Sequence, residues 1–139
     1  MNIKNIQNEI VDEFDLFDTW MDKYEYLIEL GKSIPLISQD KKTNDNIIKG
    51  CQSKVWLYAE KDAEKVKFYA DSDAVITKGI ISLLIRTFSN QKPNDIINAN
   101  TDFIDKIGLR DHLSANRANG LNNMIKKIKF YAIAFSKNS

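Results

Sequence analysis

The chain has 139 residues, and its 20 lysines and arginines nearly balance its 19 aspartates and glutamates, leaving a net charge of +1. Hydrophobic residues make up 43% and charged residues 28% of the chain, which is typical of a soluble globular protein. This length predicts a single domain over residues 1–139, and the balanced charge disfavours a dedicated nucleic-acid binder, which usually gathers basic residues on one face.

Two amphipathic helices are expected at the start of the chain. The apolar face of the first repeats at helical spacing through Ile6, Ile10, Phe14 and Phe17. Asp18 or Thr19 can cap the second helix, because their side-chain oxygens accept hydrogen bonds from free backbone N–H groups. Its apolar stripe consists of Trp20, Tyr24, Leu27 and Ile28. Gly31 is expected to end this helix as a C-cap glycine, and Pro35 prevents its resumption.

The periodicity then changes from helical to alternating. A polar loop over 38–46 leads through Ile47 and Ile48 into a strand over 55–59, where apolar residues recur at every second position. The same alternation returns over 66–70 after a turn. These patterns predict a hairpin within a small antiparallel sheet of about three strands.

Helices are expected in most of the remaining chain. Residues 71–73 end the second strand and offer N-cap oxygens, Asp73 among them, to a helix with the apolar stripe Ile76, Ile80, Leu83, Leu84 and Phe88. Gly79 inside this helix costs about 1 kcal/mol relative to alanine, which indicates close backbone packing.

Short helices after Pro93 and over 101–107, the latter closed by Gly108, precede a long final helix capped by Ser114 or Asn116. The inward face of that helix is formed by Leu121, Ile125, Ile128, Ala132 and Phe135. The whole pattern predicts an α+β fold, in which several helices cover the small antiparallel sheet.

No segment is apolar for long enough to cross a membrane. The longest apolar run, over 80–85, is interrupted by Ser82, whereas a spanning helix needs about 20 residues. Acidic residues among the first apolar positions exclude a secretory signal sequence. We therefore expect a cytoplasmic protein without a membrane partner.

The single cysteine and the single histidine limit the chemistry that is available. One cysteine excludes an internal disulfide, a CxxC pair and multi-cysteine metal sites, and one histidine excludes the two-histidine metal motifs. Cys51 lies in a glycine-containing turn, off both the helical stripes and the strand faces. Lys49 and Lys54 are close in sequence and would favour its thiolate. A lone cysteine is nevertheless most often a small buried hydrophobe.

Two further side chains are open to a functional or a structural interpretation. His112 is the only imidazole that can serve as the base of a cysteine hydrolase, although a lone histidine is more often structural. Arg117 is either a surface charge or a group that steadies an anionic sulfur or a partner carboxylate.

Four blocks in order make the chain resemble the SufE family of sulfur acceptors in iron–sulfur cluster assembly. The most specific block is N-I-I-K-G-C-Q-S-K-V-W over 46–56. The others fall within 20–35, 71–79 and 109–121. One departure is Ala115, where members of the family often have proline.

The resemblance implies a SufE/NifU-like fold, with Cys51 on a loop near a hydrophobic cavity. Cys51 would take persulfide sulfur from a pyridoxal-phosphate (PLP) cysteine desulfurase (SufS-like), stimulate that enzyme, and pass the sulfur to an iron–sulfur scaffold (SufB-like). Such a protein would be a sulfurtransferase-type accessory protein with no turnover on its own. It would be a monomer or a weak homodimer and would need no metal or cofactor of its own. Support of the loop or contact with the partner would fall to Gly50, Gln52, Ser53, Asp73, His112 and Arg117.

Three other functions stay open at this point. The same persulfide chemistry can feed another thiolation pathway, as in a CsdE-like protein. A hydrolase that uses Cys51 and His112 is less favoured, and so is an interaction module whose cysteine is structural.

Overall fold

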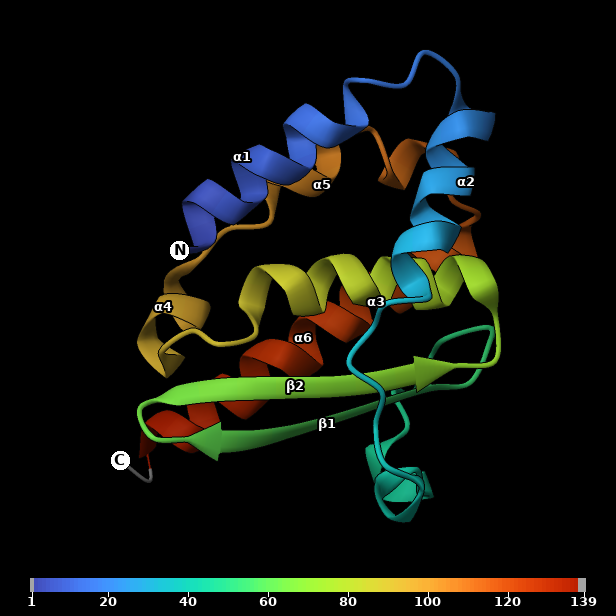
Figure 1. The fold of residues 1–139 in the computed structure, drawn as a ribbon. Coiled ribbons are helices and arrows are strands. Elements are labelled where there is room, and N and C mark those ends of the chain that lie inside the picture. Colours follow the sequence, from blue (N-terminus) through green and yellow to red (C-terminus); the bar gives the residue numbers. More distant parts are fainter. Residues whose placement is uncertain (1, 138–139) are drawn as a thin grey trace.

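The structure of the protein is a computed structural model that describes residues 2–137 (Figure 1). The longer helices are α1 (Ile3–Phe14), α2 (Trp20–Gly31), α3 (Val75–Phe88) and α6 (Ala115–Lys137), and the strands are β1 (Val55–Asp62) and β2 (Lys65–Ser72). The short elements are α4 (Pro93–Asn98), α5 (Asp102–Lys106) and the 3-10 turns η1 (Gln39–Lys41), η2 (Asn44–Asn46) and η3 (Arg110–His112). The expected α+β class is confirmed.

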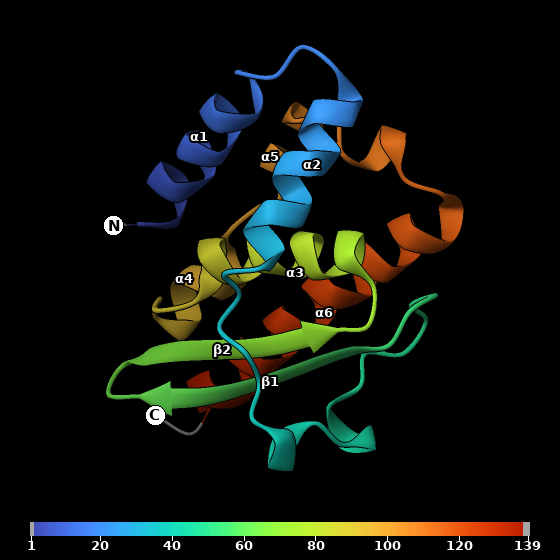
Figure 2. The ribbon, with the colours of Figure 1, turned by 45° about the vertical axis from the view of Figure 1, so that its right-hand side comes forward.

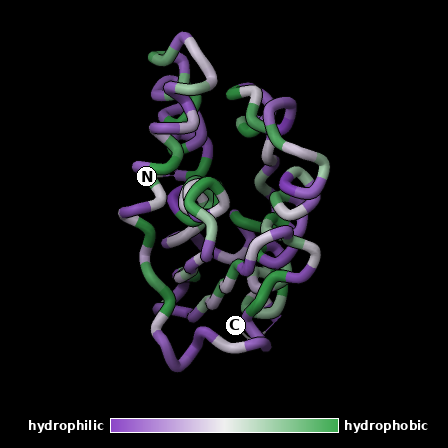
Figure 3. The backbone as a smooth tube through the Cα atoms, turned by 90° about the vertical axis from the view of Figure 1, so that its right-hand side faces the viewer, coloured by the Kyte–Doolittle hydropathy of each residue, from purple (hydrophilic) through white to green (hydrophobic). Residues whose placement is uncertain are grey.

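Helix α3 lies at the centre of the molecule. The β1–β2 hairpin lies on one side of α3 and α6, and α1, α2 and α5 lie on the other, as two views agree (Figures 1 and 2). The apolar stripe predicted for α3 explains this place, because Ile80, Leu83, Leu84 and Phe88 are all buried. The polar stretch that contains η1 and η2 lies at the edge of the molecule, at the bottom of Figure 3.

The sheet has two strands within residues 2–137, and not the three expected. Strands β1 and β2 pair antiparallel, with Val55 opposite Ser72 and Asp62 opposite Lys65. Ile47 joins β1 only through an isolated bridge to Trp56. The preceding polar loop turns through η1 and η2 and leaves too few extended residues for a third strand.

Two of the predicted helix starts are confirmed and one is wrong. The Thr19 side chain accepts from the backbone N–H of Asp22 at α2, and Ser114 caps α6 in the same way. Helix α3 begins after Ala74 without a side-chain cap. The Asp73 carboxylate instead accepts from the backbone N–H of Lys54, across the hairpin end.

Close backbone contact between α2 and α3 accounts for two glycines. A Cβ on Gly79 would lie 2.3 Å from the carbonyl oxygen of Leu27, so the expected close packing at Gly79 is confirmed. A Cβ on Gly31 would lie 2.9 Å from the Gly79 nitrogen. Gly31 is the last residue of α2 and not its C-cap, because Lys32 follows it in a right-handed helical conformation.

Helix α1 is held by burial and by a charged cluster. Ile10 and Phe14 are buried in the core. The Glu13 carboxylate accepts two hydrogen bonds from Arg86 of α3, at 2.8 and 2.5 Å, and a third from the Tyr26 hydroxyl. Hydrogen bonding to Arg86 lowers the pKa of Glu13, and burial with the neighbouring carboxylate raises the pKa of Tyr26 to about 12.

Within residues 2–137, no helix combines the length and apolar character needed to cross a bilayer.

Candidate functional site: the Cys51 loop

Cys51 lies on the loop between η2 and β1, where it packs against the first turns of α6. Its side chain is half-buried, and its Sγ lies 3.8 Å from the carbonyl oxygen of Gly120, to which the thiol donates a weak hydrogen bond. Beside the thiol is a void of about 10 Å³, lined by Cys51, Gln52, Thr77, Ile80, Asn116, Arg117, Gly120 and Met124. A space of this size holds about one water molecule.

Two asparagines of α6 hold the loop in this position. The Asn123 side-chain amide donates to the carbonyl of Lys49 at 3.0 Å, and the Asn119 amide donates to the carbonyl of Gly50 at 3.3 Å. Four residues separate the two asparagines, so both lie on one face of the helix. They satisfy two consecutive carbonyls immediately before Cys51.

Two glycines permit the loop to approach α6 so closely. Gly50 has φ +81°, a left-handed conformation that favours glycine, and a Cβ there would lie 2.4 Å from the Asn123 amide nitrogen. A Cβ on Gly120 would lie 3.1 Å from the Cys51 sulfur. Gly50 of the loop and Gly120 of the helix therefore both contribute to the close contact between the Cys51 loop and α6.

The loop is held on its other side by the end of β2. The Asp73 carboxylate accepts from the backbone N–H of Lys54 at 3.1 Å, and the Asp73 N–H donates back to the Lys54 carbonyl. The Ser72 hydroxyl donates to the same carbonyl at 2.8 Å. The segment that carries Cys51 is thus fastened at both ends, through Lys49 and through Lys54.

The electrostatic environment of the thiol differs from the one expected from sequence. Burial raises the pKa of the Cys51 thiol above its usual value. The expected help from Lys49 and Lys54 does not offset this effect, because both lysines are exposed and water screens their charges. In this conformation the protonated thiol is favoured.

Arg117 and Gln52 line the void beside the thiol, on opposite sides of the contact between loop and helix. Arg117 is exposed, and within residues 2–137 its guanidinium forms no ion pair. Ser53 continues the loop toward β1 and is partly buried. Arg117 is therefore the cation that remains available next to Cys51.

His112 is engaged elsewhere. Its ring stacks on Trp20 at 3.8 Å between centroids, and its Nδ1 lies 2.9 Å from the carbonyl oxygen of Gly108. The Tyr24 hydroxyl donates to its backbone carbonyl. His112 does not line the void beside Cys51, so the structure does not bring together the pair that a hydrolase would need. Nor do three acidic, histidine or cysteine side chains within residues 2–137 form a group able to hold a metal ion.

Comparison with known proteins assigns the chain to a family. The model of the SufE family, described as an Fe-S metabolism associated domain, matches residues 8–132. The chain belongs to the SufE family. An uncharacterized SufE-like protein of Rhizobium meliloti is 41% identical over 127 residues, which cover 88% of this chain and 91% of the relative. A second, of Rhizobium etli, is 38% identical over 127 residues, which cover 88% and 86%.

A solved structure is similar in fold to this SufE-family chain. The solution structure of a hypothetical protein from Thermus thermophilus has a TM-score of 0.77 and covers 93% of this chain and 94% of its own, at 16% identity. This similarity concerns the fold alone. Membership of the SufE family associates the protein with Fe–S metabolism.

The two asparagines that hold the SufE-family loop were missed from sequence. Asn119 and Asn123 lie on a polar stretch of the last helix, where the expected inward face is marked by Leu121 and Ile125. A usable signal was present, because two amides spaced by four residues flank the helix glycine Gly120. That spacing places them on one face, but it does not indicate which segment that face meets.

Proposed function

We propose that this protein is a sulfur carrier. It accepts sulfur as a persulfide on Cys51 from a PLP-dependent cysteine desulfurase, stimulates that enzyme and delivers the sulfur to an iron–sulfur scaffold. The observation that carries the proposal is the placement of the single cysteine of a SufE-family chain. Cys51 lies half-buried at the edge of the core, on a loop that side-chain hydrogen bonds fasten to α6.

The transfer is a thiol exchange. The Cys51 thiolate attacks the outer sulfur of the desulfurase persulfide, a new S–S bond forms, and the S–S bond of the donor breaks. The desulfurase cysteine leaves as a thiolate and takes up the proton that Cys51 has lost, so the two proteins undergo no net oxidation or reduction. The chemistry that PLP supplies belongs to the donor, and this chain needs none for the exchange.

Loading requires the loop to move. The void beside Cys51 has room for about one water molecule, and a sulfur atom is larger than a water oxygen. Burial also disfavours the thiolate that must attack. Release of the Lys49 and Gly50 carbonyls from α6 would expose the thiol, lower its pKa toward the usual value and bring it to the donor.

Neighbouring residues then take separate roles. Gly50 permits the turn, and Gln52 and Ser53 form the part of the loop that moves with Cys51. Asp73 fixes the stationary end of the loop at Lys54. Arg117 is placed to steady the anionic persulfide, because its charge is unpaired beside the void. His112 holds η3 against α2 through its stacking on Trp20. It therefore affects only the shape of the surface that this protein presents to the desulfurase.

Intact-protein mass spectrometry tests the proposal. The reduced protein is mixed with the cysteine desulfurase of the same organism and free cysteine, and peptide mapping locates the added sulfur. We expect additions of one or more sulfur atoms on Cys51 and none on Cys51→Ser. An unmodified wild-type protein, with an active desulfurase and a reduced thiol, would contradict the carrier function.

The destination of the sulfur is tested separately. Loaded protein is offered to an iron–sulfur scaffold and to a protein that thiolates RNA or a cofactor, and the sulfur is followed by mass. Loss of the sulfur to the scaffold supports the proposed route, whereas exclusive loss to the other acceptor would indicate a CsdE-like pathway.

Ester or amide turnover by the isolated chain, abolished in His112→Ala, would favour the hydrolase instead.

A further inference from the structure

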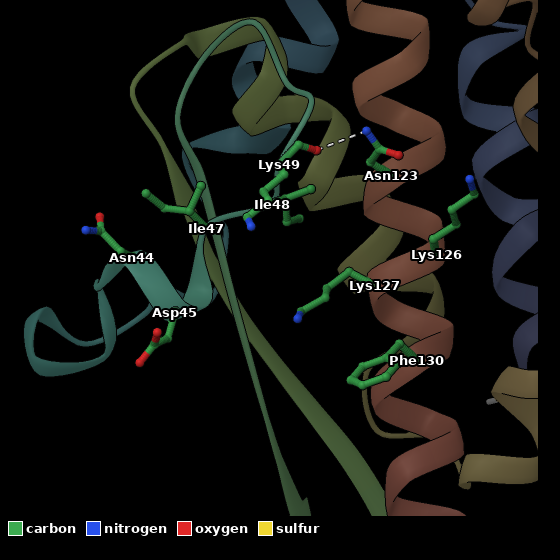
Figure 4. A pocket seen from close by; sticks show the side chains of 9 residues that line it. All are labelled: Asn44, Asp45, Ile47, Ile48, Lys49, Asn123, Lys126, Lys127 and Phe130. Carbon is green, nitrogen blue, oxygen red and sulfur yellow. Dashed lines mark hydrogen bonds between the residues drawn. The ribbon is translucent and has the colours of Figure 1, made fainter.

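A groove opens beside the Cys51 loop, between residues 44–49 and α6. Its volume is about 630 Å³ (Figure 4). The hydrogen bond from Asn123 to the Lys49 carbonyl forms part of its wall and is the same bond that holds the loop before Cys51. Whatever fills this groove therefore contacts the segment that leads to Cys51 and one of the hydrogen bonds that hold this segment, although Cys51 itself does not line the groove.

The groove is cationic. Figure 4 shows the ammonium ends of Lys49 and Lys127 directed into the space between η2 and α6, whereas Lys126 also lines the groove but its ammonium end extends away from it. Asp45 is the only acidic residue of the lining, and its carboxylate points away from the two ammonium groups. None of these four side chains forms an ion pair within residues 2–137.

The floor along α6 is partly apolar. Phe130 is 60% exposed, which is unusual for a large aromatic side chain, and the Lys127 ammonium lies 5.2 Å from the centre of its ring. Ile47 lines the opposite wall. A groove that contains two cations without ion pairs and an exposed aromatic ring is complementary to carboxylates that accompany an apolar side chain.

We propose that this groove is the docking surface for an acidic segment of the sulfur donor, carrying carboxylates and at least one apolar side chain. The inference rests on the proposed function. The carboxylates pair with Lys49 and Lys127, and the apolar side chain packs on Phe130. Contact at Lys49 acts directly on the carbonyl that Asn123 holds, so docking and release of the Cys51 loop are coupled.

The donor fits this surface better than other occupants. The wall formed by the Lys49–Asn123 bond belongs to the closed loop, and the donor is the partner that meets the loop before any sulfur is loaded. A nucleic acid requires a denser array of cations than the two that face the groove. A second copy of this chain would bring the same cations to the contact, because a twofold interface pairs a surface with itself.

Binding of the desulfurase to charge-reversal variants tests the surface. Lys127→Glu and Lys137→Glu change the net charge equally on the same helix, α6, but Lys137 is exposed and does not line the groove. Titration calorimetry of the full chain into the desulfurase should give a Kd raised about tenfold by Lys127→Glu and less than threefold by Lys137→Glu. Salt should weaken binding of the wild type more than that of Lys127→Glu. Phe130→Ala should weaken binding with an unchanged salt dependence.

The outcomes separate the two levels of the proposal. Equal Kd values for the two lysine variants, in a complex that forms and transfers sulfur, would overturn the docking surface and leave the carrier function standing. Absence of any complex with the wild-type chain would overturn both. Loss of a homodimer in Lys127→Glu, seen by sedimentation without the desulfurase, would assign the groove to a second copy. Lys127→Gln replaces Lys127→Glu if the latter lowers the melting temperature.

Discussion

Two close contacts in this molecule use helix glycines in the same way but have different partners. Between α2 and α3, Gly31 and Gly79 bring two helix backbones together. Between α6 and the Cys51 loop, Gly120 brings a helix against a thiol and a short irregular segment. The first contact lies among buried core residues, whereas the second is closed by amide hydrogen bonds from exposed or half-buried asparagines.

The two contacts differ in which of the touching segments can move. A helix backbone cannot move without loss of its own hydrogen bonds and of the core packed around it. A loop held by two side-chain hydrogen bonds can leave at a net cost of about 1 kcal/mol for each bond. The same device therefore produces a rigid contact in the scaffold and a releasable contact at the site.

Gly79→Ala should have the largest effect, on global stability. The new Cβ would lie 2.3 Å from the Leu27 carbonyl oxygen, a backbone atom that cannot rotate aside as the end of a flexible side chain can. Because the clash is with backbone, the cost should lie at the upper end of the range for overpacking, about 3 kcal/mol, against the roughly 1 kcal/mol that alanine gains in helix propensity. Urea denaturation should show a net loss of about 2 kcal/mol. Unchanged stability would mean that the α2–α3 contact is as adaptable as the loop.

Glu13→Gln should have the next largest effect, and only above acidic pH. Hydrogen bonding to Arg86 lowers the pKa of Glu13, so its stabilising effect is present above its ordinary pKa and is lost as pH falls through the folded value. We expect a loss of about 1.5 kcal/mol at neutral pH, typical of a charged hydrogen bond. The difference from the wild type should disappear in acid. Equal denaturation midpoints at neutral pH would contradict this.

Gly120→Ala is the matched counterpart of Gly79→Ala. Here the new Cβ would lie 3.1 Å from the Cys51 sulfur, and the loop can move. Stability should change by less than about 1 kcal/mol, because the gain in helix propensity offsets the lost contact. The rate at which iodoacetamide alkylates Cys51 should rise by about tenfold, since a loop destabilised by about 1.4 kcal/mol is open ten times more often. A rate equal to that of the wild type would show that the thiol reacts without loop release.

Asn123→Ala should have the smallest effect. Loss of its hydrogen bond to the Lys49 carbonyl removes about 1 kcal/mol from the closed state, so alkylation should accelerate about fivefold. Asn122→Ala, one position away and outside the loop contact, serves as the control. Faster amide exchange confined to 49–53 would accompany the effect. Exchange that rises throughout α6 would instead indicate damage to the helix.

Much of the fold could be predicted because helical and alternating periodicities are local. The apolar faces of α1, α3 and α6 lie in or against the core where their spacing places them, except that Phe17 lies beyond the end of α1 at Phe14 and outside the core. Two of the errors occurred where a residue had two competing uses. Gly31 serves helix packing and not a C-cap, and Asp73 holds Lys54 and not the start of α3. In both cases a contact between distant segments prevailed over a local role.

The family, the placement of Cys51 in a turn and the apolar faces that form the core could all be read from the sequence, because each of these depends on motifs or spacings that are local in the chain. The surroundings of the thiol, in contrast, became known only from the packing of distant segments. That packing joined Lys49 to Asn123, 74 residues apart, and held His112 against Trp20 instead of Cys51. Side-chain partners of this kind depend on how the helices pack against one another, and no local spacing encodes that packing.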